Sequence, residues 1–102
     1  MSNEPKPPKH LSRDAKALWR KIAAESDMDA AGAVLLDTLC EQWDRMHEAR
    51  ALIASQGCIV REKTAAGHEK LRPHPAIAQE HQAAQTMMKA WRLLGYDQMP
   101  PK

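Results

Sequence analysis

The chain has 102 residues, a formal net charge of +2 and no phenylalanine, and 43% of its residues are hydrophobic, largely Ala, Leu and Met. This length allows a single domain with a modest core, and the prevailing residue types favour helix. There is no run of 18 apolar residues, and the first ten residues lack the apolar core of a signal peptide, so we expect a cytoplasmic protein. In that reducing compartment Cys40 and Cys58 are not expected to form a disulfide.

Charge is distributed unevenly along the chain. Residues 1–22 carry six basic side chains against two acidic ones, and residues 25–48 carry seven acidic side chains against Arg45 alone. Such an imbalance suggests two electrostatic roles in one small chain. The basic segment is a candidate for binding a polyanion. The acidic segment is either a solvated face or a surface that repels nucleic acid.

Residues 1–10 are predicted to form a flexible basic arm. Pro5, Pro7 and Pro8 remove backbone donors and favour an extended chain. Lys6 and Lys9 allow this arm to settle on phosphate groups. The alternative is a disordered leader that only increases solubility.

The first helix is predicted from Ser12 to Glu25, with Ser12 as its N-cap. One face is apolar and consists of Leu11, Ala15, Leu18 and Ile22, with Trp19 at its side. Another face is basic and consists of Arg13, Lys16 and Arg20, with Lys21 nearby. A basic helical face is either ordinary solvated surface or a track for phosphates. We favour the second interpretation because Lys6 and Lys9 extend the same charge.

The longest predicted element is an amphipathic helix from Asp29, its N-cap, to Gln56, closed by Gly57. Its apolar face contains Leu35, Leu39, Trp43, Met46, Ala49 and Ile53, with Leu36 at the edge. Its opposite face contains Asp37, Glu41, Asp44 and Glu48. The helix would be about 40 Å long, against a diameter of roughly 26 Å for a 100-residue globule. Its apolar face therefore needs partners along its whole length, which indicates self-association.

A β-hairpin is predicted after this helix. Residues 58–60 and 70–72 read as two short strands around the turn at Ala65-Ala66-Gly67. Four cationic side chains would decorate it: Arg61, Lys63, Lys70 and Arg72. Because a lone hairpin is marginal in water, we expect it to pack on the helices or to pair with a neighbouring subunit.

The last helix is predicted from Ala76 to Leu94, after Pro75 at its first position, and Gly95 ends it. Its apolar face contains Ile77, His81, Ala84, Met88 and Trp91. With a hairpin between them, the long helix and this last helix can pack antiparallel. Residues 11–95 would then form one helical domain, followed by a short tail, 96–102.

The sequence offers little support for catalysis or for a bound cofactor. His74 and His81 are seven residues apart and could approach Cys58, but no CxxC or HxxxH pattern supports a metal site. His81 is more simply a core histidine. There is no nucleophile motif and no phosphate-binding loop. We therefore expect neither an enzyme nor a cofactor, and we interpret Trp43 and Trp91 as packing residues.

Several stretches together resemble the phage terminase small subunit family of tailed phages and prophages. They are PPKHLSRDAKALWRKI, LLDTLCEQWDRMHEARALIASQG, the CIVREK hairpin and HPAIAQEHQAAQTMMKAWRLLG, in this order and spacing. The resemblance covers roughly residues 7–95. It implies a ring-shaped homo-oligomer in the host bacterial cytoplasm that binds viral double-stranded DNA. This oligomer would recruit or regulate a large subunit, which cuts DNA and hydrolyses ATP.

Together, the residues and the resemblance predict a mainly α-helical, non-catalytic packaging adaptor. The predicted DNA-binding residues are Lys6, Lys9, Arg13, Lys16, Arg20, Lys21, Arg61, Lys63, Lys70 and Arg72. The predicted core or subunit interface consists of Leu35, Leu39, Trp43, Met46, Ile53, Met88 and Trp91. One alternative is a helical protein–protein interaction module that does not bind nucleic acid. A sequence-specific repressor is a weaker alternative, because the exposed stripe of the long helix is acidic and would repel phosphates.

Overall fold

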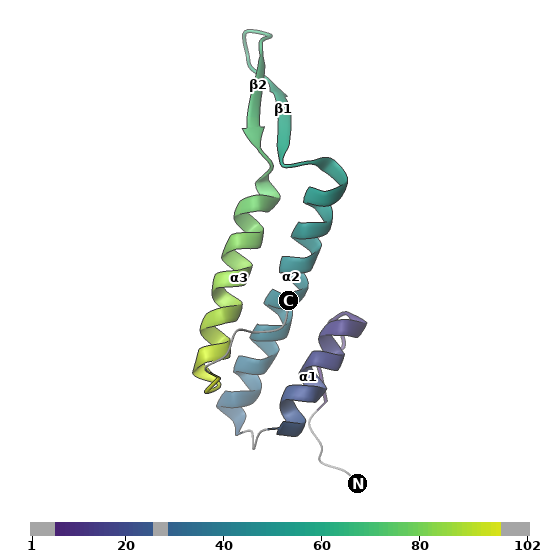
Figure 1. Ribbon diagram of the computed structural model, residues 1–102, viewed down its shortest axis with the longest axis vertical. Coiled ribbons are helices and arrows are strands. Elements are labelled where there is room, and N and C mark those ends of the chain that lie inside the picture. Colours follow the sequence, from purple (N-terminus) through teal and green to yellow (C-terminus); the bar gives the residue numbers. More distant parts are fainter. Residues whose placement is uncertain (1–5, 26–28, 97–102) are drawn as a thin grey trace.

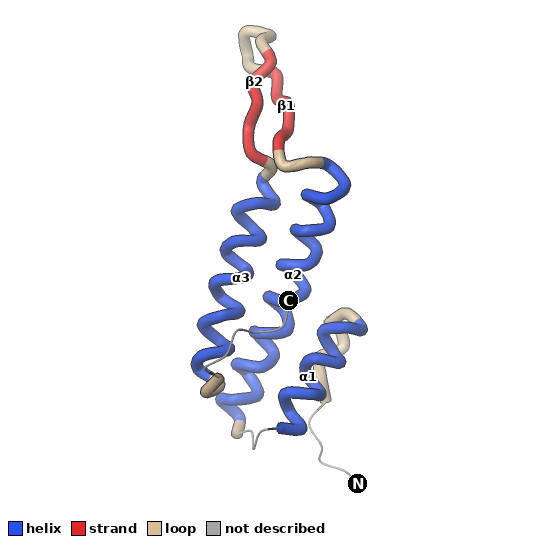
Figure 2. The backbone as a smooth tube through the Cα atoms, in the orientation of Figure 1, coloured by secondary structure: helices blue, strands red, loops and turns tan. Residues whose placement is uncertain are grey.

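The computed structural model describes residues 6–25 and 29–96, and it is mainly helical (Figure 1). In chain order the elements are α1 (Arg13–Glu25), α2 (Ala30–Gln56), β1 (Ile59–Lys63), β2 (Glu69–Pro73) and α3 (Pro75–Leu93). Helices α2 and α3 lie antiparallel, the two strands project from one end of this pair, and α1 lies beside the other half of α2 (Figure 2). The predicted fold class is confirmed, with element bounds close to those expected.

Helix α2 begins and ends where its capping residues predict. The Asp29 carboxylate accepts a hydrogen bond of 2.7 Å from the Gly32 N–H. Gly57 has φ +86°, a conformation that L side chains rarely adopt, and its N–H donates to the Ile53 carbonyl at 2.7 Å. The intervening 27 residues make the molecule long and narrow, with extents of 64 × 29 × 20 Å. Its radius of gyration of 17.6 Å exceeds the value of about 13 Å for a globule of this length.

The core lies where α1 and α3 both contact α2. Its fully buried members on α2 are Leu36, Leu39, Cys40 and Met46. Helix α1 contributes Leu11, Ala15, Trp19 and Ile22, and α3 contributes Ala83, Met87, Ala90 and Trp91. Of the predicted core residues, Leu39, Met46 and Trp91 are buried, and Leu35, Trp43, Ile53 and Met88 are half-buried.

The buried faces of α2 and α3 are rotated from those that apolar periodicity predicts. On α2, Leu36 rather than Leu35 is fully buried, because α1 covers a second side of the helix. On α3 the buried face passes through Ala76, Ala83, Met87 and Ala90. Small side chains there let α3 approach α2 closely. The prediction that His81 lies in the core is wrong, since His81 is exposed.

The strands form a two-stranded antiparallel sheet that hardly touches the helices. Ile59 pairs with Pro73 and Lys63 with Glu69. All ten strand residues are exposed except Val60, which is half-buried. Of the two expectations for the hairpin, packing on the helices is therefore not met within this single copy, and pairing with a neighbouring subunit stays a prediction.

His74 joins the hairpin to both long helices, a role that sequence analysis did not anticipate. Its Nδ1 accepts from the Ala76 N–H at 2.9 Å and so caps α3. Its Nε2 is therefore the protonated nitrogen, and it donates to the Gln56 side chain at 2.6 Å. Its backbone N–H donates to the Cys58 carbonyl at 2.8 Å.

Of the predicted N-terminal arm, residues 1–5 lie outside the described part, as does 97–102 of the predicted tail. Among the described helices, none combines the length and apolar character needed to cross a membrane.

Candidate nucleic-acid interface

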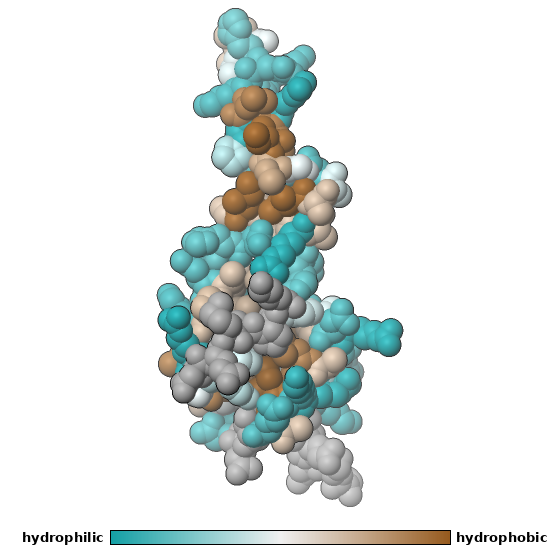
Figure 3. Space-filling model, viewed as in Figure 1, coloured by the Kyte–Doolittle hydropathy of each residue, from teal (hydrophilic) through white to brown (hydrophobic). Residues whose placement is uncertain are grey.

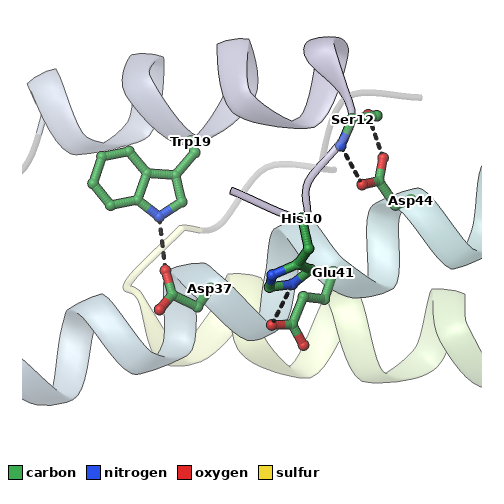
Figure 4. A network of polar contacts seen from close by, with 6 residues as sticks. All are labelled: His10, Ser12, Trp19, Asp37, Glu41 and Asp44. Carbon is green, nitrogen blue, oxygen red and sulfur yellow. Dashed lines mark hydrogen bonds and ion pairs between the residues drawn. The ribbon is translucent and has the colours of Figure 1, made fainter. Parts of the chain in front are cut away.

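The acidic face of α2 holds the N-terminal segment in place (Figure 4). We call Asp37, Glu41 and Asp44 the acidic row. The Trp19 indole N–H donates to the Asp37 carboxylate at 2.9 Å. The Ser12 backbone N–H and hydroxyl both donate to the Asp44 carboxylate, at 2.8 and 2.5 Å. The row is thus neither a bare solvated face nor a surface that only repels nucleic acid.

A third contact joins His10 to the middle of the row. His10 Nε2 lies 3.0 Å from Glu41 Oε1. The Ser12 hydroxyl also accepts from the Ala15 N–H at 3.1 Å, which confirms Ser12 as the N-cap of α1. One serine therefore caps α1 and ties its first turn to α2.

The donors to the acidic row are neutral groups and a histidine, so the lysines and arginines of α1 are not used to seat the helix. We call Arg13, Lys16, Arg20 and Lys21 the α1 basic face. Lys16 is half-buried and the other three are exposed. Within the described residues, none of the four forms an ion pair with a carboxylate.

The cationic charge continues ahead of α1. Lys6 and Lys9 are exposed in the segment that leads into the helix. Residues 6–25 contain six cationic and two acidic side chains, a net charge of +4. Because α1 lies on an acidic stretch of α2 with its cations outward, a polyanion would be attracted to the outer side of α1 and repelled from the acidic row behind it.

The hairpin cations are at the other end of the molecule (Figure 1). Arg72 lies 2.6 Å from the Glu62 carboxylate, and Arg61 lies 3.9 Å from the Glu69 carboxylate. The structure therefore separates the two predicted sets of DNA-binding residues. Among the described residues, both hairpin arginines have carboxylate partners, whereas the cations of the α1 basic face have none.

Sequence analysis missed the contacts that seat α1, although a spacing signal for them exists. Ser12 and Trp19 are seven residues apart, as are their acceptors, Asp44 and Asp37. Seven residues are close to two helical turns. If α1 lies antiparallel to α2, Ser12 can therefore reach Asp44 while Trp19 reaches Asp37.

Removing one acceptor tests how α1 is seated. Asp44→Ala leaves the Ser12 N–H and hydroxyl without their acceptor and should lower the free energy of unfolding by about 0.5–2 kcal/mol. Glu48→Ala is the matched control, because Glu48 is an exposed acid one turn further along α2. Urea unfolding followed by circular dichroism measures both. Equal stability of the two variants would contradict the seating role of Asp44.

Cys40 is buried in the core where α1 packs against α2, and this packing shields its thiol from solvent. Burial, aided by the carboxylates of Asp37, Asp44 and Glu41, raises the pKa of the Cys40 thiol from 9.0 to about 12. Cys58 is exposed. Because the thiolate is the reactive form, a chromogenic thiol reagent at pH 8 should label Cys58 rapidly and Cys40 only in denaturant. Rapid labelling of both in the native protein would mean that α1 leaves α2 readily.

The raised pKa also has a consequence for stability. A thiol whose pKa is higher in the folded state stabilises the fold fully below pH 9. That contribution declines as the pH rises from 9 towards 12.

The remaining chemistry is sparse. Within residues 6–25 and 29–96, no group of three or more His, Cys, Asp or Glu side chains is placed to hold a metal ion. A groove of about 430 Å³ runs between α2 and α3 and includes Arg45, Glu48 and Thr86 in its lining. The Thr86 hydroxyl donates to the Gln82 carbonyl of its own helix at 3.0 Å. It is therefore not paired with a base as an activated nucleophile would be.

Comparison with curated proteins and with solved structures finds no match. The model of one protein family, described as phage terminase, small subunit, matches residues 15–97. The match spans most of α1 together with α2, the hairpin and α3, and it agrees with the resemblance in the sequence. The chain therefore belongs to the phage terminase small subunit family.

Proposed function

We propose that this protein is the DNA-recognition and packaging-initiation adaptor of a phage terminase, acting as a homo-oligomer in the host bacterial cytoplasm. Membership of the family supports a role in phage DNA packaging, and small subunits of this kind are generally non-catalytic. Residues 11–95 would be its packaging domain, between an N-terminal arm (1–10) and a C-terminal tail (96–102).

The observation that carries the proposal is the orientation of α1. Neutral donors of α1 occupy Asp37 and Asp44 of α2, and three of the four cations of the α1 basic face are exposed. Phosphates of double-stranded DNA would replace solvent and counterions on the α1 basic face, with Lys6 and Lys9 extending the contact. Such binding is sensitive to salt and nearly independent of sequence.

Self-association is supported by apolar surface that one copy leaves uncovered. Six large hydrophobic side chains are between 38% and 70% exposed: Val34, Leu52, Ile59, Leu71, Ile77 and Leu93. They occur along a narrow body whose longest dimension is 64 Å. In a closed ring each copy would present its α1 basic face once, so weak phosphate contacts would add through multivalency.

Recruitment or regulation of the large terminase subunit completes the proposal. A protein without a catalytic site contributes to packaging by bringing the DNA and the cutting enzyme together. The acidic row is occupied by α1, so it is a poor surface for this docking, and the groove between α2 and α3 is more accessible.

Two measurements on the purified chain test the proposal. Labelled double-stranded DNA of unrelated sequences is titrated at rising salt, and the mass of the protein in solution is measured on the same sample. We expect an oligomer that binds all sequences with similar affinity and loses affinity steeply as salt rises. An oligomer that does not bind DNA even at low salt would instead support a protein–protein interaction module.

A further inference from the structure

The outer edges of the hairpin carry unpaired backbone groups on a regular subset of residues. Hydrogen bonds join Cys58 to His74 and Thr64 to His68 at the two ends of the ladder. Opposite residues in an antiparallel pair alternate between bonded and non-bonded pairs. The bonded pairs are therefore at even positions, and the backbone groups of residues 59, 61 and 63 point away from β2. Those of residues 69, 71 and 73 point away from β1, although Pro73 has no N–H to offer.

A two-stranded sheet with both edges open and neither face covered is marginally stable by itself. This hairpin projects from the helices and has no helix on either face. Ile59 and Leu71 lie on the same face and are 59% and 63% exposed. Leu52 and Ile77, near the adjoining helix ends, are also partly exposed. Figure 3 shows hydrophobic surface gathered over the hairpin and the helix ends next to it.

The charges of the strands disfavour symmetric pairing between copies. If β1 pairs with β1 of another copy through the outward residues, Arg61 lies opposite Arg61, Lys63 or Ile59, depending on the register. If β2 pairs with β2, Lys70 faces Arg72 of the other copy. Like charges directly opposite one another destabilise a strand pair. The β2 arrangement and two of the three β1 registers therefore carry a repulsive pair, and none of these two-fold arrangements places opposite charges across from one another.

Pairing of unlike edges removes this repulsion. When β1 of one copy lies antiparallel to β2 of the next copy, in the register that the hairpin uses internally, Lys63 faces Glu69 and Glu62 faces Lys70. Both are opposite-charge pairs, and Ile59 lies beside Pro73 and diagonal to Leu71 of the next copy. We propose that the hairpins of successive copies join in this way, β1 edge to β2 edge, into one continuous antiparallel sheet.

This contact uses different surfaces on the two copies, so it generates a ring when the rotation closes. Strand directions alternate around this ring, β1 and β2 in turn, so every copy has the same orientation relative to the ring axis. A two-stranded unit occupies about 9.6 Å of sheet width, whereas the narrowest extent of the molecule is 20 Å. The hairpins would therefore lie nearer the ring axis than the helices do. The inference rests on the self-association part of the proposed function and adds the surface that mediates it.

Disulfide cross-linking between two different chains tests this pairing. In a Cys58→Ser background, a Lys63→Cys chain is co-expressed with a Glu69→Cys chain, and each is also expressed alone. Mild oxidation should cross-link chains in the mixture and in neither single preparation, because bonded strand pairs have the Cα separation that a disulfide needs. A cross-link in Lys63→Cys alone would mean symmetric β1 pairing, and no cross-link in an intact oligomer would also overturn the inference.

A backbone block provides an independent test. Arg61→Pro removes one outward N–H of β1 and leaves the bonds within the hairpin intact. Arg61→Ala removes the same side chain and keeps the N–H. We expect the protein concentration needed for half assembly to rise at least tenfold for Arg61→Pro relative to Arg61→Ala. Equal assembly of the two variants contradicts the edge contact. If the two variants assemble equally and their oligomers bind DNA, the edge contact is wrong but the proposed function stands. A wild-type protein that is monomeric at all concentrations would overturn both the edge contact and the proposed function.

Discussion

Neutralising Arg13 and Arg20 together should weaken binding to double-stranded DNA by at least about tenfold at a salt concentration near 50 mM. Each phosphate contact contributes about 0.9 to the slope of log affinity against log salt. The double variant Arg13→Gln/Arg20→Gln should therefore flatten that slope by about 1.8 for each copy that contacts DNA. Both residues are exposed on α1, which is seated through Ser12 and Trp19 instead. The fold should consequently be unaffected.

The matched control removes two cations from another part of the surface. Lys89 and Arg92 are exposed on α3 and, among the described residues, form no ion pair. Lys89→Gln/Arg92→Gln changes the net charge by the same amount. Fluorescence anisotropy at several salt concentrations compares the two variants, and thermal melting checks that each is folded. An equal loss of affinity in both would mean that net charge, and not the α1 basic face, attracts DNA.

The position of α1 is also where sequence analysis reached its limit. Periodicity and caps located the helices of the described residues, because Asp29, Gly57 and Pro75 act through local backbone chemistry. Which side of α2 receives α1 depends on contacts between residues far apart in the chain. The acidic row looks like a solvated stripe until Ser12 and Trp19 are placed opposite it.

The faces of α2 and α3 show the same limit at the level of single residues. Apolar periodicity averages over a helix and treats Leu35 and Leu36 as centre and edge of one stripe. A helix that packs against two other helices has no single apolar stripe. A residue that lies between those two helices is buried most deeply. On α3, Ile77 is large and apolar but 38% exposed, whereas the small Ala76 beside it is 1% exposed.

For the candidate site, the sequence identified the cations but not which of them lack carboxylate partners. Arg61 and Arg72 on the hairpin look as suitable for phosphate as Arg13 and Arg20. The strand register brings Glu69 and Glu62 next to them, and that register depends on how residues 59–73 pair. Local carboxylates would then compete with any phosphate for the hairpin arginines, so we expect α1 to be the stronger site.

Replacing Leu35 and Leu36 of α2 by alanine, one at a time, should distinguish the core seen in the structure from the core that apolar periodicity predicts. Leu36 is fully buried between α1 and α3, so Leu36→Ala should lower the free energy of unfolding by about 3–4 kcal/mol. Leu35 is half-buried, and Leu35→Ala should cost only about 1–2 kcal/mol. Since a domain of this size is stabilised by roughly 5–15 kcal/mol in total, the first change removes a large share of its stability.

Thermal and urea unfolding, compared at one protein concentration because assembly also stabilises the fold, measure the difference. The melting temperature of Leu36→Ala should fall by at least about 12 °C. A larger loss for Leu35→Ala would place the core on the side of α2 that single-helix periodicity predicts. Helix α1 would then not cover Leu36. The loss of that contact would remove the rigid support that aims the α1 basic face outward, so this stability measurement also tests the proposed DNA interface.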